Sequence, residues 1–296
     1  MVRRNVHWIR TEGIGRFVEG HELHPVRRTA ARIGRARWRD DHPVAAGEAR
    51  PVFLFGIPRS GTNMLARALA ASPEFEVHND GDREAFHRHR LRSNDVIRAI
   101  VLRSRQRFVA FKPLLDDGRV HELLELGTPV APKALWLYRD PDGRARSALR
   151  TFDAAARDAL RAIAEGRGRH RWEIAGLSGK SLDLIRQVEW DRASPADGAM
   201  LLWFVRNARF FELGLDARAD VLPLSYDALV RSPESTMQVV SAFLEAGGDP
   251  AMAAGIDGRS IGRDERLAIR PDIRARCDAL AARLDAVARA AAGRYA

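Results

Sequence analysis

A short apolar run, a glycine-containing loop and an amphipathic helix follow one another over residues 52–71, and this arrangement limits most strongly what the chain can fold into. Residues 52–55 read Val-Phe-Leu-Phe and lead directly into Gly56. Such a run is typical of a strand buried on both faces of a parallel sheet. Residues 63–71 then carry apolar side chains at helical spacing, and a proline at position 73 comes after them. The segment predicts a buried strand, a tight turn and a helix.

The rest of the chain repeats this alternation of buried strands and helices. Further strands are expected at residues 108–111, 134–138 and 221–224, and helices at 93–105, 120–126, 144–165, 195–213, 233–245 and 272–294. Pro223 cannot donate to a sheet ladder, so the last strand is expected near an edge. Alternating strands and helices indicate an α/β fold with a mostly parallel sheet flanked by helices.

The domain organisation depends on where this alternation begins. Residues 51–296 are expected to form a single domain, because no segment inside them has the composition of a linker. Residues 1–50 are rich in arginine, and we expect an extension that packs on the main domain, with a basic helix within residues 25–38.

Composition excludes several classes of protein. Among 296 residues, 46% are hydrophobic and 30% are charged, which is ordinary for a globular protein and excludes disordered and collagen-like chains. The 49 basic side chains exceed the 39 acidic ones and give a net charge of +10, which suits either a polyanionic ligand or a solvated basic surface. The arginines are spread along the chain without a nucleic-acid-binding motif, so no nucleic-acid partner is predicted.

Neither disulfides, metal centres nor membrane spans are expected. The single cysteine, Cys277, lies in an amphipathic stretch and is predicted to be a buried core thiol. His21 and His24 share a helical spacing but have no third ligand beside them, so no metal site is predicted. No apolar run is long enough to cross a bilayer and no secretory signal is present, which favours a cytoplasmic protein. The oligomeric state stays open.

The loop after the first strand carries the strongest functional signal. It reads Gly-Ile-Pro-Arg-Ser-Gly-Thr-Asn over residues 56–63, and its glycines let the backbone wrap around a phosphate at the start of the next helix. The pattern is close to a P-loop, which ends in Gly-Lys-Ser/Thr. Here Thr62 and Asn63 occupy the positions of that lysine and of the hydroxyl that binds Mg²⁺, while Arg59 supplies a cation inside the loop.

This modified loop resembles that of the sulfotransferases that use 3′-phosphoadenosine 5′-phosphosulfate (PAPS). In that family the pattern Pro-Arg/Lys-Ser/Thr-Gly-Thr/Ser opens a helix and binds the 5′-phosphosulfate. The resemblance gives that role to a set of five residues, namely Arg59, Ser60, Gly61, Thr62 and Asn63. The family's second motif is a strand followed by Arg-Asp/Asn-Pro, with a serine eight residues after the arginine. Arg139 and Ser147 match it here and are expected to bind the 3′-phosphate.

Two weaker matches extend the resemblance to roughly residues 51–245. Lys112 comes after the strand at 108–111, where many family members carry a lysine that supports the transferred sulfuryl group. It is one of only three lysines in the chain, and a plain surface lysine is an equally good interpretation. Tyr226 lies in a segment similar to the family's Tyr-Glu-Asp-Leu and is expected either near the adenine or in the core.

The catalytic base is expected just after the loop helix. The candidates there are His78, Asn79, Asp80, Asp82, Glu84 and His87. Alignment through the proline at position 73 puts the family's glutamate on Asp80, so Asp80 is the first choice and Glu84 the second. The chain departs from the family here, because it has Asp in place of Glu and lacks the usual Gly-Glu pair.

Taken together, the motifs predict a metal-independent enzyme. It would transfer a sulfuryl group from PAPS to an acceptor hydroxyl or amine, with Arg59 and Lys112 supplying positive charge and Asp80 or Glu84 acting as base. The acceptor is left open among small molecules, carbohydrates and natural-product scaffolds. Two other classes remain as alternatives, an ATP-dependent small-molecule phosphotransferase and a basic nucleic-acid-binding protein.

Overall fold

The computed structural model describes residues 34, 36–168, 172–257 and 266–296. The chain divides into two units, Met1–Val44 and Ala45–Ala296. In the first unit, residues 36–41 are helical, whereas His21, His24 and most of the helix expected over 25–38 lie outside the described residues. The second unit contains the sheet and the helices that pack on it.

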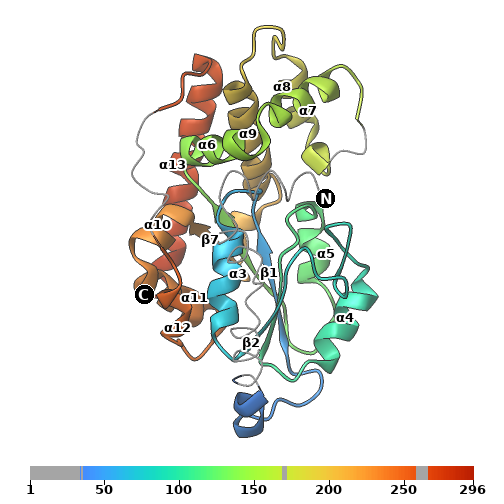
Figure 1. The fold of residues 1–296 in the computed structure, drawn as a ribbon, viewed down its shortest axis with the longest axis vertical. Coiled ribbons are helices and arrows are strands. Elements are labelled where there is room, and N and C mark those ends of the chain that lie inside the picture. The colour runs from blue at the N-terminus through green and yellow to red at the C-terminus, as the bar shows by residue number, and fades with distance from the viewer. Residues whose placement is uncertain (1–33, 35, 169–171, 258–265) are drawn as a thin grey trace. The chain divides into compact units, whose positions relative to one another are not determined.

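A parallel five-stranded sheet forms the centre of this second unit (Figure 1). Its order is β2-β5-β1-β6-β7, and every neighbouring pair runs parallel. The strands are β1 (Arg50–Phe55), β2 (Phe75–His78), β5 (Phe108–Phe111), β6 (Lys133–Tyr138) and β7 (Val221–Ser225). The α/β class and the four expected strands are confirmed, and β7 is an edge strand in which Pro223 lies opposite Trp136.

Helices cover both faces of the sheet because the strand side chains alternate between two apolar clusters. On one face lie α3 (Thr62–Ala71), α10 (Tyr226–Arg231), α11 (Pro233–Leu244) and α12 (Ala251–Ala254). The other face is covered by α4 (Asn94–Arg103), α5 (Val120–Leu124), α9 (Pro195–Glu212) and most of α13 (Pro271–Ala292). Cys277 is buried in α13, as predicted, and burial raises the pKa of its thiol to about 12.

The helix expected over 144–165 is wrong as a single element. It forms two helices, α6 (Pro141–Phe152) and α7 (Ala155–Ala164), both of which pack on α9. The break is at Asp153, whose φ of 48° and ψ of −128° are not helical and end α6. Neither glycine nor proline marks the break, so periodicity alone could not find it.

Three strands were not expected from the sequence. The edge strand β2 reads Phe-Glu-Val-His, too short and too polar to stand out as a buried run. The other two, β3 (Phe86–His87) and β4 (Arg90–Leu91), form an antiparallel hairpin that lies outside the main sheet.

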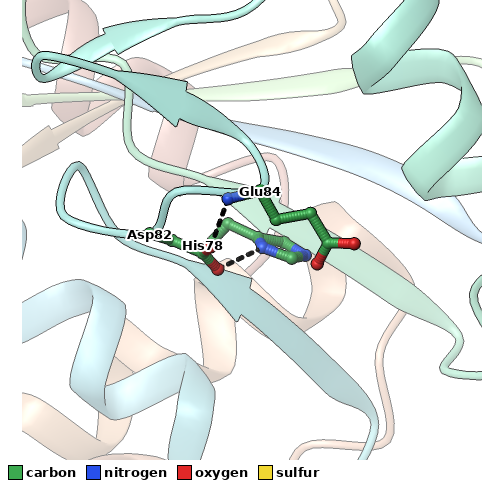
Figure 2. A group of neighbouring side chains, drawn as sticks. All are labelled: His78, Asp82 and Glu84. Atoms are coloured by element: carbon green, nitrogen blue, oxygen red, sulfur yellow. Dashed lines mark hydrogen bonds and ion pairs between the residues drawn. The ribbon is translucent and has the colours of Figure 1, made fainter.

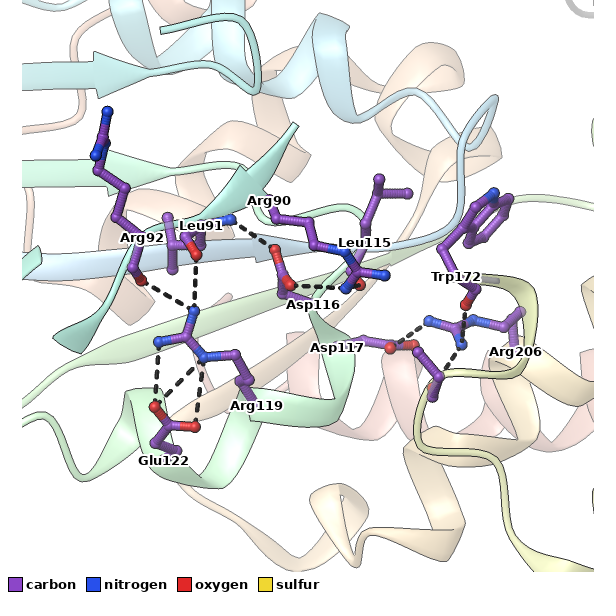
Figure 3. A network of polar contacts seen from close by, with 11 residues as sticks. Arg90, Leu91, Arg92, Leu115, Asp116, Asp117, Arg119, Glu122, Trp172 and Arg206 are labelled. Atoms are coloured by element: carbon purple, nitrogen blue, oxygen red, sulfur yellow. Dashed lines mark hydrogen bonds and ion pairs between the residues drawn. The ribbon is translucent and has the colours of Figure 1, made fainter. Parts of the chain in front are cut away.

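Buried ion pairs hold α9 to the segment after β5 (Figure 3). Asp117 pairs with Arg206 and lies 3.4 Å from Arg209 Nε, and all three side chains are nearly inaccessible to water. Arg206 also donates to the carbonyl oxygens of Trp172 at 3.2 Å and Ala175 at 3.0 Å. A short 3-10 turn, η2 (Trp172–Ile174), is thereby fixed to α9. The next helix, α8 (Gly179–Arg186), is joined to α9 by Ser178 and Ser181, whose hydroxyls donate to Glu212 at 2.8 and 3.1 Å.

No helix among the described residues is both long enough and apolar enough to span a membrane.

We expect Asp117→Asn to destabilise the protein strongly, because it removes the buried carboxylate that faces the guanidinium groups of both Arg206 and Arg209. The free energy of unfolding in urea should fall by about 3–5 kcal/mol. Asp95→Asn is the matched control, since Asp95 also pairs with an arginine but its side chain is 89% exposed, and it should cost no more than about 1 kcal/mol. Equal losses for the two variants would contradict a structural role for the buried cluster.

Candidate functional site

The candidate site lies along the edge of the sheet where the parallel strands end. The loop that begins at Gly56 leaves β1, Lys112 comes after β5 and Arg139 comes after β6. His78 is the last residue of β2, and Tyr226 comes directly after β7. Because all five strands run in the same direction, these residues meet at one edge. There the connection after β1 leads to β2 on one side of it, and the connection after β5 crosses to β6 on the other side. Ligands of open α/β sheets typically bind at such a place.

The loop between β1 and α3 depends on two glycines in left-handed conformations. Gly56 has φ 143°, and a Cβ there would lie 2.4 Å from the carbonyl oxygen of Leu137. Gly61 has φ 93°, and a Cβ there would lie 2.2 Å from the ring of Tyr226. Arg59 takes the left-handed region at φ 79° although it is not glycine, which is a strained conformation typical of binding loops.

The start of α3 offers an anion site. Gly61 is its N-cap residue, no side chain caps it, and its first turn holds no acidic residue. The first amides of a helix have no partner one turn earlier, and the helix dipole adds positive potential there. Ser60 just before it is fully buried, and its Oγ has no hydrogen-bond partner. Amides together with an orphaned buried hydroxyl fit an anionic oxygen-rich group such as a phosphate or sulfate.

Arg59 and Ser147, which the sequence assigned to two different phosphates, lie in contact. Arg59 Nε donates to Ser147 Oγ at 3.0 Å, so the loop after β1 is joined to α6. The two motifs, 88 residues apart in sequence, therefore form one surface. Thr62 is also buried and packs its methyl group toward Gly56.

Arg144 is a site residue that was not expected from the sequence. It is fully buried on α6, where its Nε donates to the carbonyl oxygen of Pro58 at 3.2 Å and its Nη1 to that of Ala199 at 3.1 Å. Burial, and next the positive charge of Arg59, lower the pKa of Arg144 from 12.5 to about 9, which leaves it charged at neutral pH. Its position three residues before Ser147 puts both on one helical face, and this spacing could have revealed it.

Arg139 and Tyr226 pack against each other at the ends of β6 and β7. The Arg139 guanidinium lies 4.4 Å from the centre of the Tyr226 ring, a cation–π arrangement. The same ring lies against Gly61, so Tyr226 joins the arginine to the loop after β1. Trp203 Nε1 donates to the Arg139 carbonyl oxygen at 2.8 Å and fixes the end of β6 to α9.

Lys112, Asp80 and Asn63 form a second polar group at the same edge. The Lys112 side chain is only 3% exposed, and its Nζ lies 2.8 Å from Asp80 Oδ1 and hydrogen-bonds Asn63 Oδ1. Asn63 lies in the first turn of α3, so Lys112 connects the loop helix to the segment after β2. Asp80 is about one-third exposed, which leaves its carboxylate open to a molecule from solvent.

The other base candidates lie in different surroundings. The carboxylate of Glu84 forms an ion pair with Arg103 at the end of α4 and makes no contact with Lys112. His87 is exposed on β3. His89, which the sequence did not single out, donates from Nδ1 to the Asp80 backbone oxygen at 3.1 Å and lies 3.6 Å from Asp80 Oδ2.

His78 is buried at the end of β2 between the carboxylates of Glu76 and Asp82, of which Figure 2 draws Asp82. Its Nδ1 lies 2.7 Å from Asp82 and its Nε2 lies 3.0 Å from Glu76. Burial alone would lower the pKa of His78, but hydrogen bonds and charge from Glu76 and Asp82 outweigh it and raise the pKa above its ordinary 6.5. Burial conversely raises the pKa of Glu76, and hydrogen bonds from His78 and Ser104 outweigh that effect and lower it.

The ion pairs of His78 also bear on the one group of side chains, among the described residues, that could hold a metal ion. Suitable atoms of His78, Asp82 and Glu84 lie within 4.8 Å of one another. A metal ligand must be a neutral imidazole, whereas carboxylates on both ring nitrogens favour the doubly donating cation and raise the pKa of His78. We therefore interpret the grouping as an ion-paired histidine that shapes the segment leading to Asp80.

Comparison with known proteins gives structural likeness only. No family model matches the chain, and no curated protein matches it. Solved structures similar to it include a sulfotransferase from Alicyclobacillus acidocaldarius, with 20% identity, a TM-score of 0.45, and coverage of 82% of this chain and 95% of that chain. The sulfotransferase domain of the Synechococcus PCC 7002 olefin synthase has 16% identity, a TM-score of 0.44, and coverage of 79% and 95%. A sulfotransferase from Mycobacterium avium has 14% identity, a TM-score of 0.43, and coverage of 86% and 81%.

All three are sulfotransferases, the family that the loop motifs resemble. Likeness at this level carries no argument about function, which rests instead on the side chains at the sheet edge.

We expect the charged form of His78 to stabilise the fold. Because the folded-state pKa lies above the ordinary value, this contribution is complete below about pH 6.5 and is lost as the pH rises through the raised pKa. The measurement is urea unfolding of the wild type and of His78→Asn at pH 6 and pH 9. The wild type should exceed the variant by more at pH 6, and a difference that is the same at both pH values would contradict the ion-paired histidine.

Proposed function

We propose that the protein transfers a sulfuryl group from PAPS to an acceptor hydroxyl or amine. The observation that carries the proposal is the pair of contacts at the sheet edge, Arg59 with Ser147 and Lys112 with Asp80. The first contact joins the loop after β1 to α6. The second joins the residue after β5 to the segment after β2, and Lys112 also hydrogen-bonds Asn63 in the first turn of α3. An anion site can bind the donor, a cation can offset the charge that develops on the transferred oxygens, and a carboxylate can take the acceptor's proton.

The proposed donor site consists of the start of α3 and the side chains around it. The uncapped amides of α3, the Ser60 hydroxyl and Arg59 would bind the 5′-phosphosulfate. Arg139 and Ser147 would bind the 3′-phosphate, and the Tyr226 ring that packs on Arg139 would border the nucleoside. Arg144 would act as a positioning residue, because it fixes the Pro58 carbonyl and with it the loop that carries Arg59.

Lys112 and Asp80 are the proposed reacting groups. Bound PAPS would supply an activated sulfuryl group whose bond to the 5′-phosphate oxygen breaks as the bond to the acceptor forms. Lys112 would offset the negative charge that develops on the transferred oxygens, and Asp80 would take the proton that the acceptor hydroxyl or amine loses. The products are the sulfated acceptor, adenosine 3′,5′-bisphosphate and the proton on Asp80.

An ATP-dependent phosphotransferase fits the same side chains less well. Thr62, which occupies the position of the P-loop lysine, is buried with its methyl group toward Gly56. Asn63, which occupies the position of the Mg²⁺-binding hydroxyl, accepts a hydrogen bond from Lys112. The two functions therefore differ in which nucleotide the protein should bind.

Adenosine 3′,5′-bisphosphate should stabilise the protein with EDTA present, whereas ATP with Mg²⁺ should stabilise it much less. At a ligand concentration about a hundredfold above Kd, the melting temperature should rise by roughly 5–10 °C. Arg59→Gln should weaken the binding by about tenfold or more, because a charge-assisted contact to phosphate is lost. Arg67→Gln, an exposed arginine of α3, is the matched control and should bind as the wild type does. Stabilisation by ATP–Mg²⁺ alone would favour the phosphotransferase instead.

Asp80→Asn should lower kcat by about 10²–10⁴ without weakening nucleotide binding, because a positioned base contributes that much and the nucleotide is held elsewhere. Glu84→Gln removes a nearby carboxylate that pairs with Arg103, and it should leave kcat near the wild-type value. The readout is steady-state release of adenosine 3′,5′-bisphosphate alongside calorimetric binding of the same nucleotide. The reverse ranking of the two variants would move the base to Glu84.

A further inference from the structure

The tip of the β3–β4 hairpin has an unfavourable backbone conformation. The hairpin pairs Phe86 with Leu91 and His87 with Arg90, so Arg88 and His89 form a two-residue turn. Both have positive φ, 49° and 66°, a conformation for which such turns normally use asparagine and glycine. Left-handed backbone is unfavourable for most side chains, because Cβ crowds the carbonyl oxygen that comes after it, whereas asparagine, aspartate and histidine adopt it more readily. Positive φ at both central positions is what a type I′ turn requires, and its cost in side chains such as arginine makes the turn a candidate for a functional role.

The contacts of β4, the strand that follows this turn, hold it in place (Figure 3). The Leu91 amide donates to the buried Asp116 carboxylate at 2.7 Å. Arg119 donates from Nη1 to the carbonyl oxygens of Leu91 at 3.1 Å and Arg92 at 3.0 Å. The Leu91 side chain is itself buried. The hairpin is thus anchored through β4 to the segment that follows β5.

The surface of this hairpin carries an excess of positive charge. Arg83, Arg88 and Arg90 all reach solvent, and only Arg90 has a carboxylate partner, the same Asp116 that binds the Leu91 amide. Arg83 and Arg88 make no ion pair with any residue that the structure describes. The one acidic side chain among residues 83–92, Glu84, is already paired with Arg103.

This charge lies beside the proposed reacting groups. His89 at the hairpin tip contacts Asp80, Asp80 contacts Lys112, and each step is at most 3.6 Å. A molecule that presents its hydroxyl to the exposed carboxylate of Asp80 therefore lies next to the hairpin.

We propose that the hairpin is an acceptor subsite and that the acceptor carries an anionic group, a carboxylate, a sulfate or a phosphate, near the hydroxyl that is modified. Arg88 and Arg83 bind this group and thereby aim the hydroxyl at Asp80. This inference rests on the proposed function for the role of the acceptor, but binding of the anion to the hairpin does not depend on turnover.

The test compares four sugars that differ at one position: glucose, glucuronate, glucose 6-sulfate and glucose 6-phosphate. Their binding to the wild type is measured by NMR titration with adenosine 3′,5′-bisphosphate present, and again without it. At least one anionic sugar should bind about tenfold or more tightly than glucose. The identity of that sugar distinguishes the three anions. Equal binding of all four, or no preference for an anion, would overturn the proposal.

The double variant Arg83→Gln/Arg88→Asn should abolish this preference. Asparagine tolerates the left-handed turn, so the variant should unfold at the same or a higher urea concentration than the wild type. Arg276→Gln, which removes an exposed charge from α13, is the matched control and should keep the preference. A double variant that still prefers the anionic sugar, or one that is clearly less stable, would overturn the assignment.

Failure of this inference is distinguishable from failure of the proposed function. Nucleotide binding is measured separately on the same samples. If the protein binds adenosine 3′,5′-bisphosphate but shows no preference for an anionic sugar, the proposed function stands and the acceptor subsite is wrong. If it binds the anionic sugars but not the nucleotide, the anion subsite stands and the proposed sulfuryl transfer is wrong.

Discussion

Parallel pairing obliges all five strands of the sheet to end at one edge, and the candidate site is built from the residues that come directly after the strands there. The loop after β1, Lys112 after β5, Arg139 after β6 and Tyr226 after β7 come together although they are far apart along the chain. The apolar clusters on both faces of the sheet fix the register of these strands. The ends of the strands therefore position the cationic side chains of the site next to one another.

Concentrating positive charge at this edge has an electrostatic cost that the fold offsets locally. Arg144 is fully buried and close to Arg59. Burial, and next the positive charge of Arg59, lower the pKa of Arg144 and so disfavour its charged form. The carbonyl oxygens of Pro58 and Ala199 accept hydrogen bonds from Arg144 and compensate part of its desolvation. An anion at the start of α3 would relieve the remaining repulsion, so we expect a bound phosphate or sulfate to stabilise the loop as well as to occupy it.

Much of this arrangement could be predicted from the sequence, and the exceptions have physical causes. The strands β1, β5, β6 and β7 carry continuous apolar runs because both of their faces are buried, and such runs are easy to recognise. The edge strand β2 and the hairpin carry no such run. The contact between Arg59 and Ser147 could not be predicted, because it depends on how α6 packs and not on spacing along the chain. The contacts of Arg144 and His89 likewise depend on tertiary packing.

A crystal structure of the protein with adenosine 3′,5′-bisphosphate tests the central claim most directly. We predict the 5′-phosphate at the start of α3, within hydrogen-bond distance of Ser60 Oγ and Arg59, and the 3′-phosphate on Arg139. Ser60 Oγ, which has no partner now, should gain one. A nucleotide bound elsewhere on the molecule, or one whose phosphates leave α3 and Arg139 untouched, would contradict the proposed donor site.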